Sequence, residues 1–381
     1  MPDPPPPASR PRVAFLLPAT SRVPVGGPKV FYEYANALAA DGYGVSVVHS
    51  FTGGGWPRPC TWSGAGHFAK TLLRSAWHRL RGWHRAPPWF PLDPRVRFRV
   101  VWSLAESRLP PADLYIVSDA RTAATASRYR SIPPERLIHF VQGHETWALS
   151  TAELAALYRS PVRKIAISGW LVREIEQAGG KAAIIPNAID PDRFRMAVPP
   201  EERHPACVGL LFHTAAVKDA GTGLRALELA KAREPGLEAR LFGAFPMDRD
   251  LPDWMSYVRN PSPQQLLDFY NGISIFLGTS RQEGWGLTVG EAMACGAAVV
   301  CTDNDGYAEM AIDGRTAKVV PAGDAERMAD ALLELVHDDA ERIRLARAGH
   351  DHIQSFTWAR SVALLEAQLQ DAWREGGAVG K

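Results

Sequence analysis

Short runs of consecutive apolar residues alternate with segments of helical periodicity along most of the chain. The apolar runs predict strands over 13–17, 45–49, 98–102, 114–117, 137–141 and 165–168 in the first half, and over 207–212, 239–242, 273–277, 297–301 and 317–320 in the second. Helical spacing predicts helices over 29–41, 169–178, 221–234, 263–270, 325–337, 340–349 and 358–373, with Ser168 as an N-cap. This alternation predicts an α/β fold of parallel sheets covered by helices.

The length of 381 residues exceeds what one hydrophobic core usually organises, so two domains are expected. The polar, proline-bearing stretch that follows Ile185 is typical of a linker between them. The predicted organisation is a flexible Pro-rich lead-in (1–11), an N-terminal Rossmann-like domain (12–190), a linker (191–205), a C-terminal Rossmann-like domain (206–357), and a closing helix and tail (358–381).

Composition narrows the possible partners and compartments. The net charge of +2 gives no reason to expect nucleic acid as a partner. The four cysteines Cys60, Cys207, Cys295 and Cys301 lack metal-site spacing, which favours reduced, structural thiols and a cytoplasmic protein. The chain shows neither a signal-peptide core nor a run of roughly 20 apolar residues, so any membrane contact is expected to be peripheral, at the inner face.

The turn from Glu283 to Glu291 is the most informative stretch. Its sequence, EGWGLTVGE, places two carboxylates on either side of seven residues that include Gly284, Gly286 and Gly290. Glycines allow close backbone approach, and a helix beginning near Thr288 offers amides to an anion such as phosphate. Phosphate and hydroxyl recognition together indicate a sugar nucleotide. The alternative is a simple capping box, in which Glu291 bonds back to the Thr288 amide.

This segment resembles the paired-glutamate motif of the retaining glycosyltransferases of family 4. The resemblance extends through EAMACG (291–296), VVCTD (299–303), Gly306, Glu309, and the stretch from Asp313-Gly314 to Pro321, Gly323 and Asp324. It implies the GT-B fold, with two Rossmann-like domains facing across a cleft and a C-terminal helix returning to the first domain. It also implies that Glu291 binds the ribose, that Glu283 binds the sugar, and that the backbone of Gly286, Leu287 and Thr288 contacts the diphosphate.

Two further segments correspond to phosphate-binding positions of that family. Gly26 and Gly27 stand in the first βα turn, just before a predicted helix, where backbone amides meet a diphosphate. After the strand 207–212, the family typically carries an arginine and a lysine five positions apart. This chain has His213 and Lys218 there, so the lysine matches and the arginine does not. A neutral histidine still donates one hydrogen bond, whereas a protonated one restores the charge. Lys218 as a solvated turn residue is the alternative.

His144 and Glu145 follow the strand 137–141, at the carboxyl end where ligands of open α/β sheets gather. The family often has a histidine here, beside the transferred sugar or the acceptor, and a purely structural histidine is the alternative. The resemblance thus gives His144, Glu283 and Lys218 as the catalytic residues.

Two other patterns have competing interpretations. The pairs Asp303/Asp305 and Asp248/Asp250 look like metal-binding Asp-X-Asp motifs, but aspartates crowd turns for local reasons, and the family manages without a divalent ion. No metal and no cofactor is therefore expected. The basic, tryptophan-bearing stretch 70–90 fits either contact with an anionic membrane surface or a solvated helix with buried indoles.

The predicted function is retaining, metal-independent transfer of a hexosyl or deoxyhexosyl group from a nucleotide-diphosphate sugar to an acceptor hydroxyl. The acceptor would be a carbohydrate, a lipid-linked molecule or a small metabolite. A GT-B epimerase or phosphorylase, or a non-catalytic sugar-nucleotide-binding protein, are the alternatives.

Overall fold

The structure is a computed structural model that describes residues 10–22, 24–51, 85–247 and 250–378. The chain divides into two compact units: unit 1 comprises Met1–Ile185 and Val362–Lys381, and unit 2 comprises Pro186–Ser361. Cys60, Asp248 and most of the basic stretch 70–90 lie outside the described residues.

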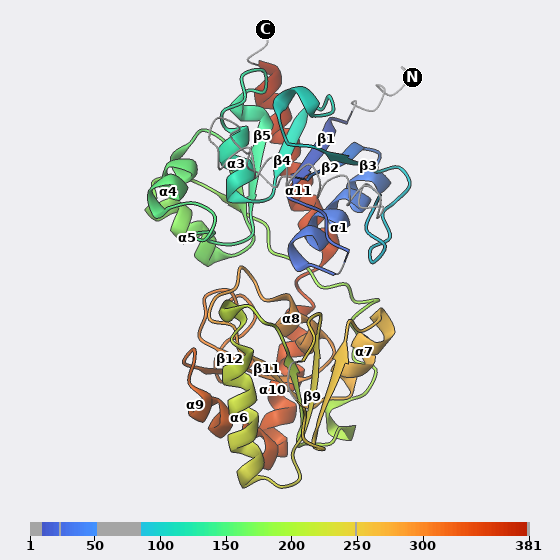
Figure 1. The fold of residues 1–381 in the computed structure, drawn as a ribbon, viewed down its shortest axis with the longest axis vertical. Coiled ribbons are helices and arrows are strands. Elements are labelled where there is room, and N and C mark those ends of the chain that lie inside the picture. Colours follow the sequence, from blue (N-terminus) through green and yellow to red (C-terminus); the bar gives the residue numbers. More distant parts are fainter. Residues whose placement is uncertain (1–9, 23, 52–84, 248–249, 379–381) are drawn as a thin grey trace, which may run out of the picture. The chain divides into compact units, whose positions relative to one another are not determined.

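Unit 1 is built on a seven-stranded parallel sheet in the order β3-β2-β1-β4-β5-β6-β7 (Figure 1). Its strands are β1 (Arg12–Leu17), β2 (Gly44–Ser50), β3 (Arg97–Val101), β4 (Leu114–Val117), β5 (Leu137–Val141), β6 (Arg163–Ala166) and β7 (Ala183–Ile184). Its helices are α1 (Gly26–Ala40), α3 (Ala120–Ala126), α4 (Thr151–Arg159), α5 (Gly169–Gln177) and, from Val362 onward, α11 (Trp358–Ala378). Strands β1, β4 and β5 are almost entirely buried because their apolar runs are covered on both faces.

The final helix α11 is tied to unit 1 by charged side chains. Arg163 at the start of β6 donates to Glu375 at 2.7 Å and to Gln368 at 3.2 Å. Arg10, just ahead of β1, lies 3.5 Å from Glu366. The buried residues Leu365, Leu369 and Ala372 add an apolar stripe at helical spacing.

Unit 2 repeats the design with a six-stranded parallel sheet in the order β10-β9-β8-β11-β12-β13. Its strands are β8 (Cys207–Leu211), β9 (Glu238–Gly243), β10 (Met255–Arg259), β11 (Ile275–Gly278), β12 (Ala298–Thr302) and β13 (Lys318–Val320). Its helices are α6 (Ala220–Arg233), α7 (Pro263–Asn271), α8 (Leu287–Ala294), α9 (Ala325–His337) and α10 (Asp339–Ile353). Helix α6 packs against α9, and α10 packs against α8 and β12.

Both sheets have the strand order of doubly wound folds, in which the order reverses beside the first strand. The reversal falls between β1 and β4 in unit 1 (Figure 1) and between β8 and β11 in unit 2. In such sheets the loops at the carboxyl ends of these two strands diverge and leave room for a ligand. The predicted site residues of unit 2 follow β8 and β11 directly.

Several sequence predictions need correction. Helix α1 begins at Gly26, three residues earlier than predicted, so the glycine pair forms its first turn instead of preceding it. Ser168 does occupy the N-cap of α5, but its side chain makes no capping bond. Strands β7 and β10 were missed. Both are poorly buried: β7 has only two residues, and β10 buries only Met255.

Candidate active site

The centre of the candidate site is an ion pair between residues 65 positions apart. Lys218 ends the short turn η4 (Ala216–Lys218) after β8, and Glu283 lies in the loop after β11. Lys218 Nζ is 2.5 Å from Glu283 Oε1, and the Ser280 hydroxyl donates to the same oxygen at 2.7 Å. The two side chains are 27% and 14% exposed, so the pair is reachable from solvent. Among the described residues, Oε2 of Glu283 has no hydrogen-bond partner.

The loop that carries Glu283 is held in place by its neighbours. Asn304, just after β12, donates to the Ser280 carbonyl at 2.9 Å, and Thr302 donates to the same carbonyl at 2.5 Å. Gly306 packs directly on the loop, because a Cβ there would lie 2.3 Å from the Glu283 carbonyl oxygen. Glu283 is therefore placed by the end of β12, through two side-chain hydrogen bonds to the loop and one close backbone approach.

The glycines of the motif are required by packing. Gly286 is the N-cap of α8, with a left-handed φ of 97°, and a Cβ there would be 2.4 Å from the Tyr307 ring. Gly290 faces Ile189 and Trp285, with Cβ distances of 3.1 Å to each. Gly296 has a left-handed φ of 79° just past the end of α8. The close approach predicted for Gly286 and Gly290 is therefore to other side chains.

Helix α8 begins at Leu287, one residue earlier than predicted, which rules out the capping-box alternative. With Gly286 as N-cap, Thr288 is inside the helix, and the helix has no side-chain capping bond. Glu291 is consequently in the second turn, not the first. Its side chain is 7% exposed, and its Oε2 accepts a hydrogen bond from the Tyr270 hydroxyl at 3.0 Å. Among the described residues, the amides of Leu287 and Thr288 have no hydrogen-bond partner, so they can bind an anion.

His213 follows β8 and is neutral near pH 7. Burial and the nearby Lys218 lower its pKa. Its Nδ1 accepts the Ala215 amide at 2.9 Å, which leaves the proton of the neutral ring on Nε2. The ring also packs edge-on against Phe245 at 4.7 Å. At the family's arginine position this chain therefore presents a hydrogen-bond donor and no second charge.

The predicted residues of unit 1 gather at the carboxyl edge of its own sheet. Gly27 lies against Gln142, whose Oε1 would be 3.0 Å from a Cβ at that position. His144, two residues later, packs near Tyr158 and Trp170, and its Nδ1 is 3.6 Å from a carboxylate oxygen of Glu174. The loop after β5, which carries Gln142 and His144, therefore contacts the first turn of α1 through Gln142 and Gly27.

Glu145 anchors the His144 loop to α3. Its Oε2 accepts the amide of Ala120 at 2.7 Å. Burial raises the pKa of this carboxyl to about 7, and the neighbouring Asp119 adds to the rise. Glu145 therefore has a structural partner at the start of α3.

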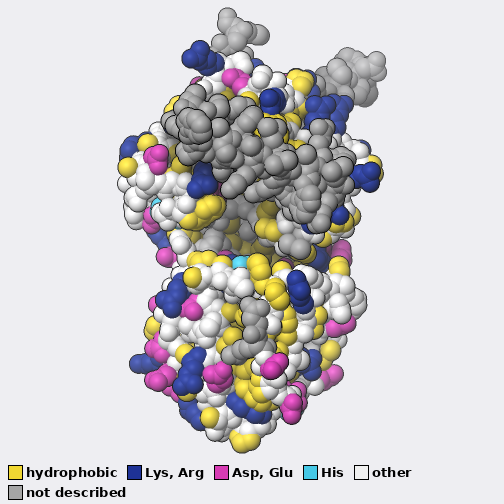
Figure 2. All heavy atoms as spheres, in the orientation of Figure 1, with side chains coloured by type: hydrophobic (Ala, Val, Ile, Leu, Met, Phe, Trp, Pro, Cys, Tyr) yellow, Lys and Arg dark blue, Asp and Glu magenta, His cyan; other side chains and the backbone are white. Residues whose placement is uncertain are grey.

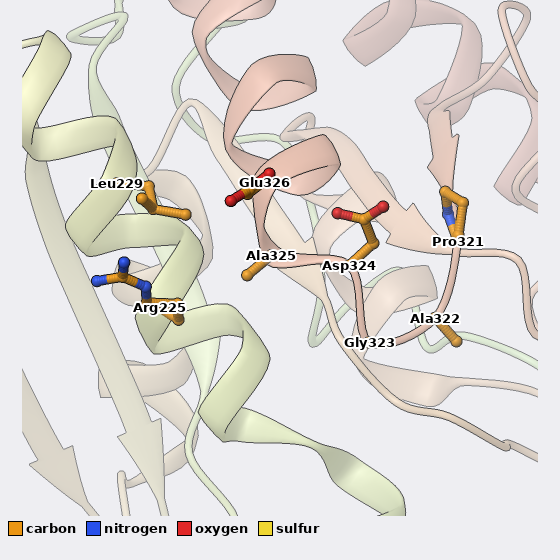
Figure 3. Close-up of a pocket in the computed structure, with 8 residues that line it drawn as sticks. All are labelled: Arg225, Leu229, Pro321, Ala322, Gly323, Asp324, Ala325 and Glu326. Atoms are coloured by element: carbon orange, nitrogen blue, oxygen red, sulfur yellow. The ribbon is translucent and has the colours of Figure 1, made fainter.

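A hollow of unit 2, of about 540 Å³, lies between α6 and the loop leading into α9 (Figure 3). It is lined by Arg225, Leu229 and the stretch 321–326, and none of the predicted site residues takes part. In Figure 3 the side chains of Arg225 and Asp324 do not converge on a common point. Asp324 caps α9 by accepting the Arg327 amide at 2.9 Å, so its carboxylate is engaged in the fold.

Other groups considered in the sequence have structural surroundings. Asp303 accepts the Ala322 amide at 2.9 Å. Within the described ranges, no group of three His, Cys, Asp or Glu side chains is arranged to hold a metal ion. Cys207, Cys295 and Cys301 are free and buried, and burial raises the pKa of the Cys295 thiol to about 12. No helix in the described part of the chain is long and apolar enough to cross a membrane.

Comparison of the sequence with protein-family models gives a match within unit 2. Residues 203–338 match the family model described as glycosyl transferases group 1, a range that contains Lys218, Glu283 and Glu291. The chain carries a group 1 glycosyltransferase domain. Its motif-based resemblance to such enzymes is thereby confirmed for this domain.

Curated relatives of the glycosyltransferase domain match over limited lengths. One is a D-inositol 3-phosphate glycosyltransferase from Corynebacterium aurimucosum, 37% identical over 110 residues, covering 29% of this chain and 26% of the relative. Another is a phosphatidyl-myo-inositol mannosyltransferase from Mycobacterium leprae, 38% identical over 77 residues, covering 20% and 21%. The chain thus spans about a quarter of the length of the curated relatives it matches.

Solved structures resemble the whole chain. Sucrose-phosphate synthase from Thermosynechococcus elongatus has a TM-score of 0.68 at 16% identity, covering 97% of this chain and 100% of its own. The Anabaena protein HepE in complex with UDP-glucose has a TM-score of 0.65 at 16% identity, covering 96% and 100%. The shared fold confirms the predicted GT-B class, in which the glycosyltransferase domain is the second Rossmann-like unit.

Proposed function

We propose that the protein is a retaining, metal-independent glycosyltransferase that moves a sugar from a nucleotide-diphosphate donor to an acceptor hydroxyl. The observation that supports this most is the Lys218–Glu283 pair at the strand-order reversal of unit 2. It combines a cation for phosphate with a carboxylate whose Oε2 is unoccupied among the described residues. The diphosphate of a nucleotide sugar calls for the cation, and the hydroxyls of its sugar call for the carboxylate.

In this proposal the donor lies along the carboxyl edge of the unit 2 sheet. Glu291 accepts hydrogen bonds from the ribose, and Glu283 accepts them from the sugar through Oε2. The amides of Leu287 and Thr288, at the N-terminus of α8, bind the diphosphate together with Lys218. His213 donates a hydrogen bond to the diphosphate from its Nε2–H group. Its lowered pKa keeps the ring neutral, and its Nδ1 already accepts the Ala215 amide.

From the family resemblance, we also propose a phosphate-binding role for Gly26 and Gly27 of unit 1. They form the first turn of α1, where backbone amides lack helical partners. His144 acts at the reacting sugar, where its ring stabilises the transition state more than the bound donor. The roles of Gly26, Gly27 and His144 rest on the family resemblance. All three residues lie at the carboxyl edge of the unit 1 sheet.

The chemistry proposed is a front-face substitution. The bond between the anomeric carbon and the diphosphate oxygen breaks, and the acceptor oxygen bonds to the same face of that carbon. The acceptor proton passes to the departing diphosphate, and the anomeric configuration is kept. Lys218 and the α8 amides stabilise the charge that grows on the leaving group, a type of electrostatic stabilisation that requires no metal ion.

The comparisons suggest which molecules to test. HepE was solved with UDP-glucose, and the curated relatives are named for inositol phosphate or phosphatidylinositol acceptors. We propose a nucleotide-diphosphate hexose as donor. The acceptor is a hydroxyl group of a polyol, a carbohydrate or a lipid-linked molecule. We also propose peripheral contact with an anionic membrane surface through the basic, tryptophan-bearing stretch 70–90.

Product analysis tests this proposal. The full chain is incubated with UDP-glucose or GDP-mannose, with and without inositol 3-phosphate or phosphatidylinositol, and Glu283→Gln serves as the control. The expected result is nucleotide diphosphate release that depends on an acceptor and falls at least about 100-fold in the variant. Epimerised donor without acceptor, a requirement for free phosphate, or donor binding without turnover would each contradict glycosyl transfer.

A further inference from the structure

We propose that Tyr270 is a positioning residue that orients the Glu291 carboxylate for donor binding; this inference rests on the proposed function of Glu291. The Tyr270 hydroxyl donates to Glu291 Oε2 at 3.0 Å. The two residues come from different helices, α7 and α8, and both are buried, at 0% and 7% exposure. No sequence motif links them.

The Tyr270 ring is held rigidly by other aromatic rings. Four of them surround it, with ring centroids 5.4 to 5.9 Å away: Phe194, Phe242, Phe269 and Phe276. Edge and tilted contacts of this kind fix the plane of a ring as well as its position. Its hydroxyl oxygen therefore has one place in the core, and that place is beside Glu291.

The backbone of Tyr270 is fixed by a second contact. Arg203 is 6% exposed and donates to the Tyr270 carbonyl at 3.2 Å, to the Ile273 carbonyl at 2.9 Å, and to the Cys295 carbonyl. Tyr270 is in the last turn of α7, and Cys295 is the C-cap of α8. A single guanidinium thus joins the C-terminal ends of both helices, where a cation is also favoured by the helix dipoles.

The direction of the hydrogen bond is settled by the environment. Burial and the neighbouring Glu291 raise the pKa of Tyr270 well above its usual range, so the phenol keeps its proton and donates it. A carboxylate that must accept hydrogen bonds from two ribose hydroxyls needs a defined rotation about the Cγ–Cδ bond of the glutamate. A phenol fixed by four rings and by Arg203 provides that rotation before the ligand arrives, which lowers the cost of ordering on binding.

Tyr270→Phe removes the hydroxyl and keeps the ring in its aromatic surroundings. UDP, GDP and ADP are titrated calorimetrically into the full-length protein, and the nucleotide that wild type binds most tightly is used thereafter. We expect Tyr270→Phe to weaken its binding by about 10-fold and to raise the donor KM similarly, with kcat nearly unchanged. Tyr115→Phe is the matched control. It removes another buried phenol, which donates to the Pro110 carbonyl at 3.0 Å in unit 1.

A double-mutant cycle separates positioning from mere support of the fold. If Tyr270 acts through Glu291, then Tyr270→Phe has no further effect on nucleotide affinity in a Glu291→Gln background. Equal effects of Tyr270→Phe in both backgrounds, or an unchanged affinity in the single variant, would overturn the proposal. Failure of Glu291→Gln itself to weaken binding of any of the three nucleotides would instead contradict the assigned role of Glu291.

Discussion

At the scale of single residues, His144 is the side chain whose role is least determined by its surroundings. Its ring packs near Tyr158 and Trp170, and its Nδ1 has only a 3.6 Å contact with Glu174. The side chain is 20% exposed, so part of the ring is accessible to a ligand. The buried His49, by contrast, makes hydrogen bonds to the Tyr32 hydroxyl and the Pro18 carbonyl.

We expect His144→Ala to lower kcat by about 100-fold or more and to leave nucleotide affinity nearly unchanged, because the lost interaction strengthens only in the transition state. Turnover per folded molecule is the measurement. His139→Ala is the control, since His139 is buried in β5 and burial lowers its pKa to about 3. Similar turnover in the two folded variants would assign His144 to the scaffold.

At the scale of elements, the candidate site depends on how the β12 end supports the β11 loop. Gly306 and Asn304 come from one strand end, and Glu283 and Ser280 come from the other. The contact of Gly306 with Glu283 is between backbones, so the distance that separates the two loops has little tolerance. Only glycine at 306 allows this approach.

Gly306→Ala tests that dependence. We expect the added methyl group to displace Glu283, to raise the donor KM, and to lower the free energy of unfolding by about 1 to 3 kcal/mol. Denaturant unfolding and steady-state kinetics measure the two effects. Gly221→Ala in α6 controls for stability, because a Cβ there has no atom within 4 Å and is expected to be neutral or slightly stabilising. Unchanged donor KM in Gly306→Ala would show that the loop adjusts.

The elements also show what the sequence could reveal. Strands with continuous apolar runs, such as β4 and β5, were predicted with their observed bounds, because burial on both faces produces an unambiguous pattern. Strand β10 was missed, since an edge strand that buries only Met255 carries almost no pattern. The early start of α1 was missed because glycines disfavour helix interiors, although the first turn tolerates them.

The same limit applies to the candidate site. Glu283, Lys218 and Glu291 were found through spacing and family resemblance, and the parallel sheet brings the first two together across 65 positions. Tyr270 was not found, because its contact with Glu291 joins two helices through the core. Nothing in the local sequence of α7 distinguishes a phenol that supports a site from one that only fills space.

At the scale of the whole molecule, the charge distribution gives little long-range guidance to an anionic donor. The net charge is +2, and on the face of unit 2 seen in Figure 2 basic and acidic side chains are intermingled. In the proposed function, recognition of the diphosphate therefore depends on local groups, namely Lys218, the His213 Nε2–H group and the helix N-termini. Such groups act at contact distance and are screened only weakly by salt.

The most direct test of the central claim, metal-independent transfer with retention, is to follow the anomeric signal of the product by proton NMR in the presence of EDTA. An α-linked sugar nucleotide should give an α-linked product, at a rate unchanged by the chelator, because Lys218 and backbone amides hold the leaving diphosphate. A β-linked product would contradict retention. Loss of turnover in EDTA that magnesium or manganese restores would contradict the absence of a metal.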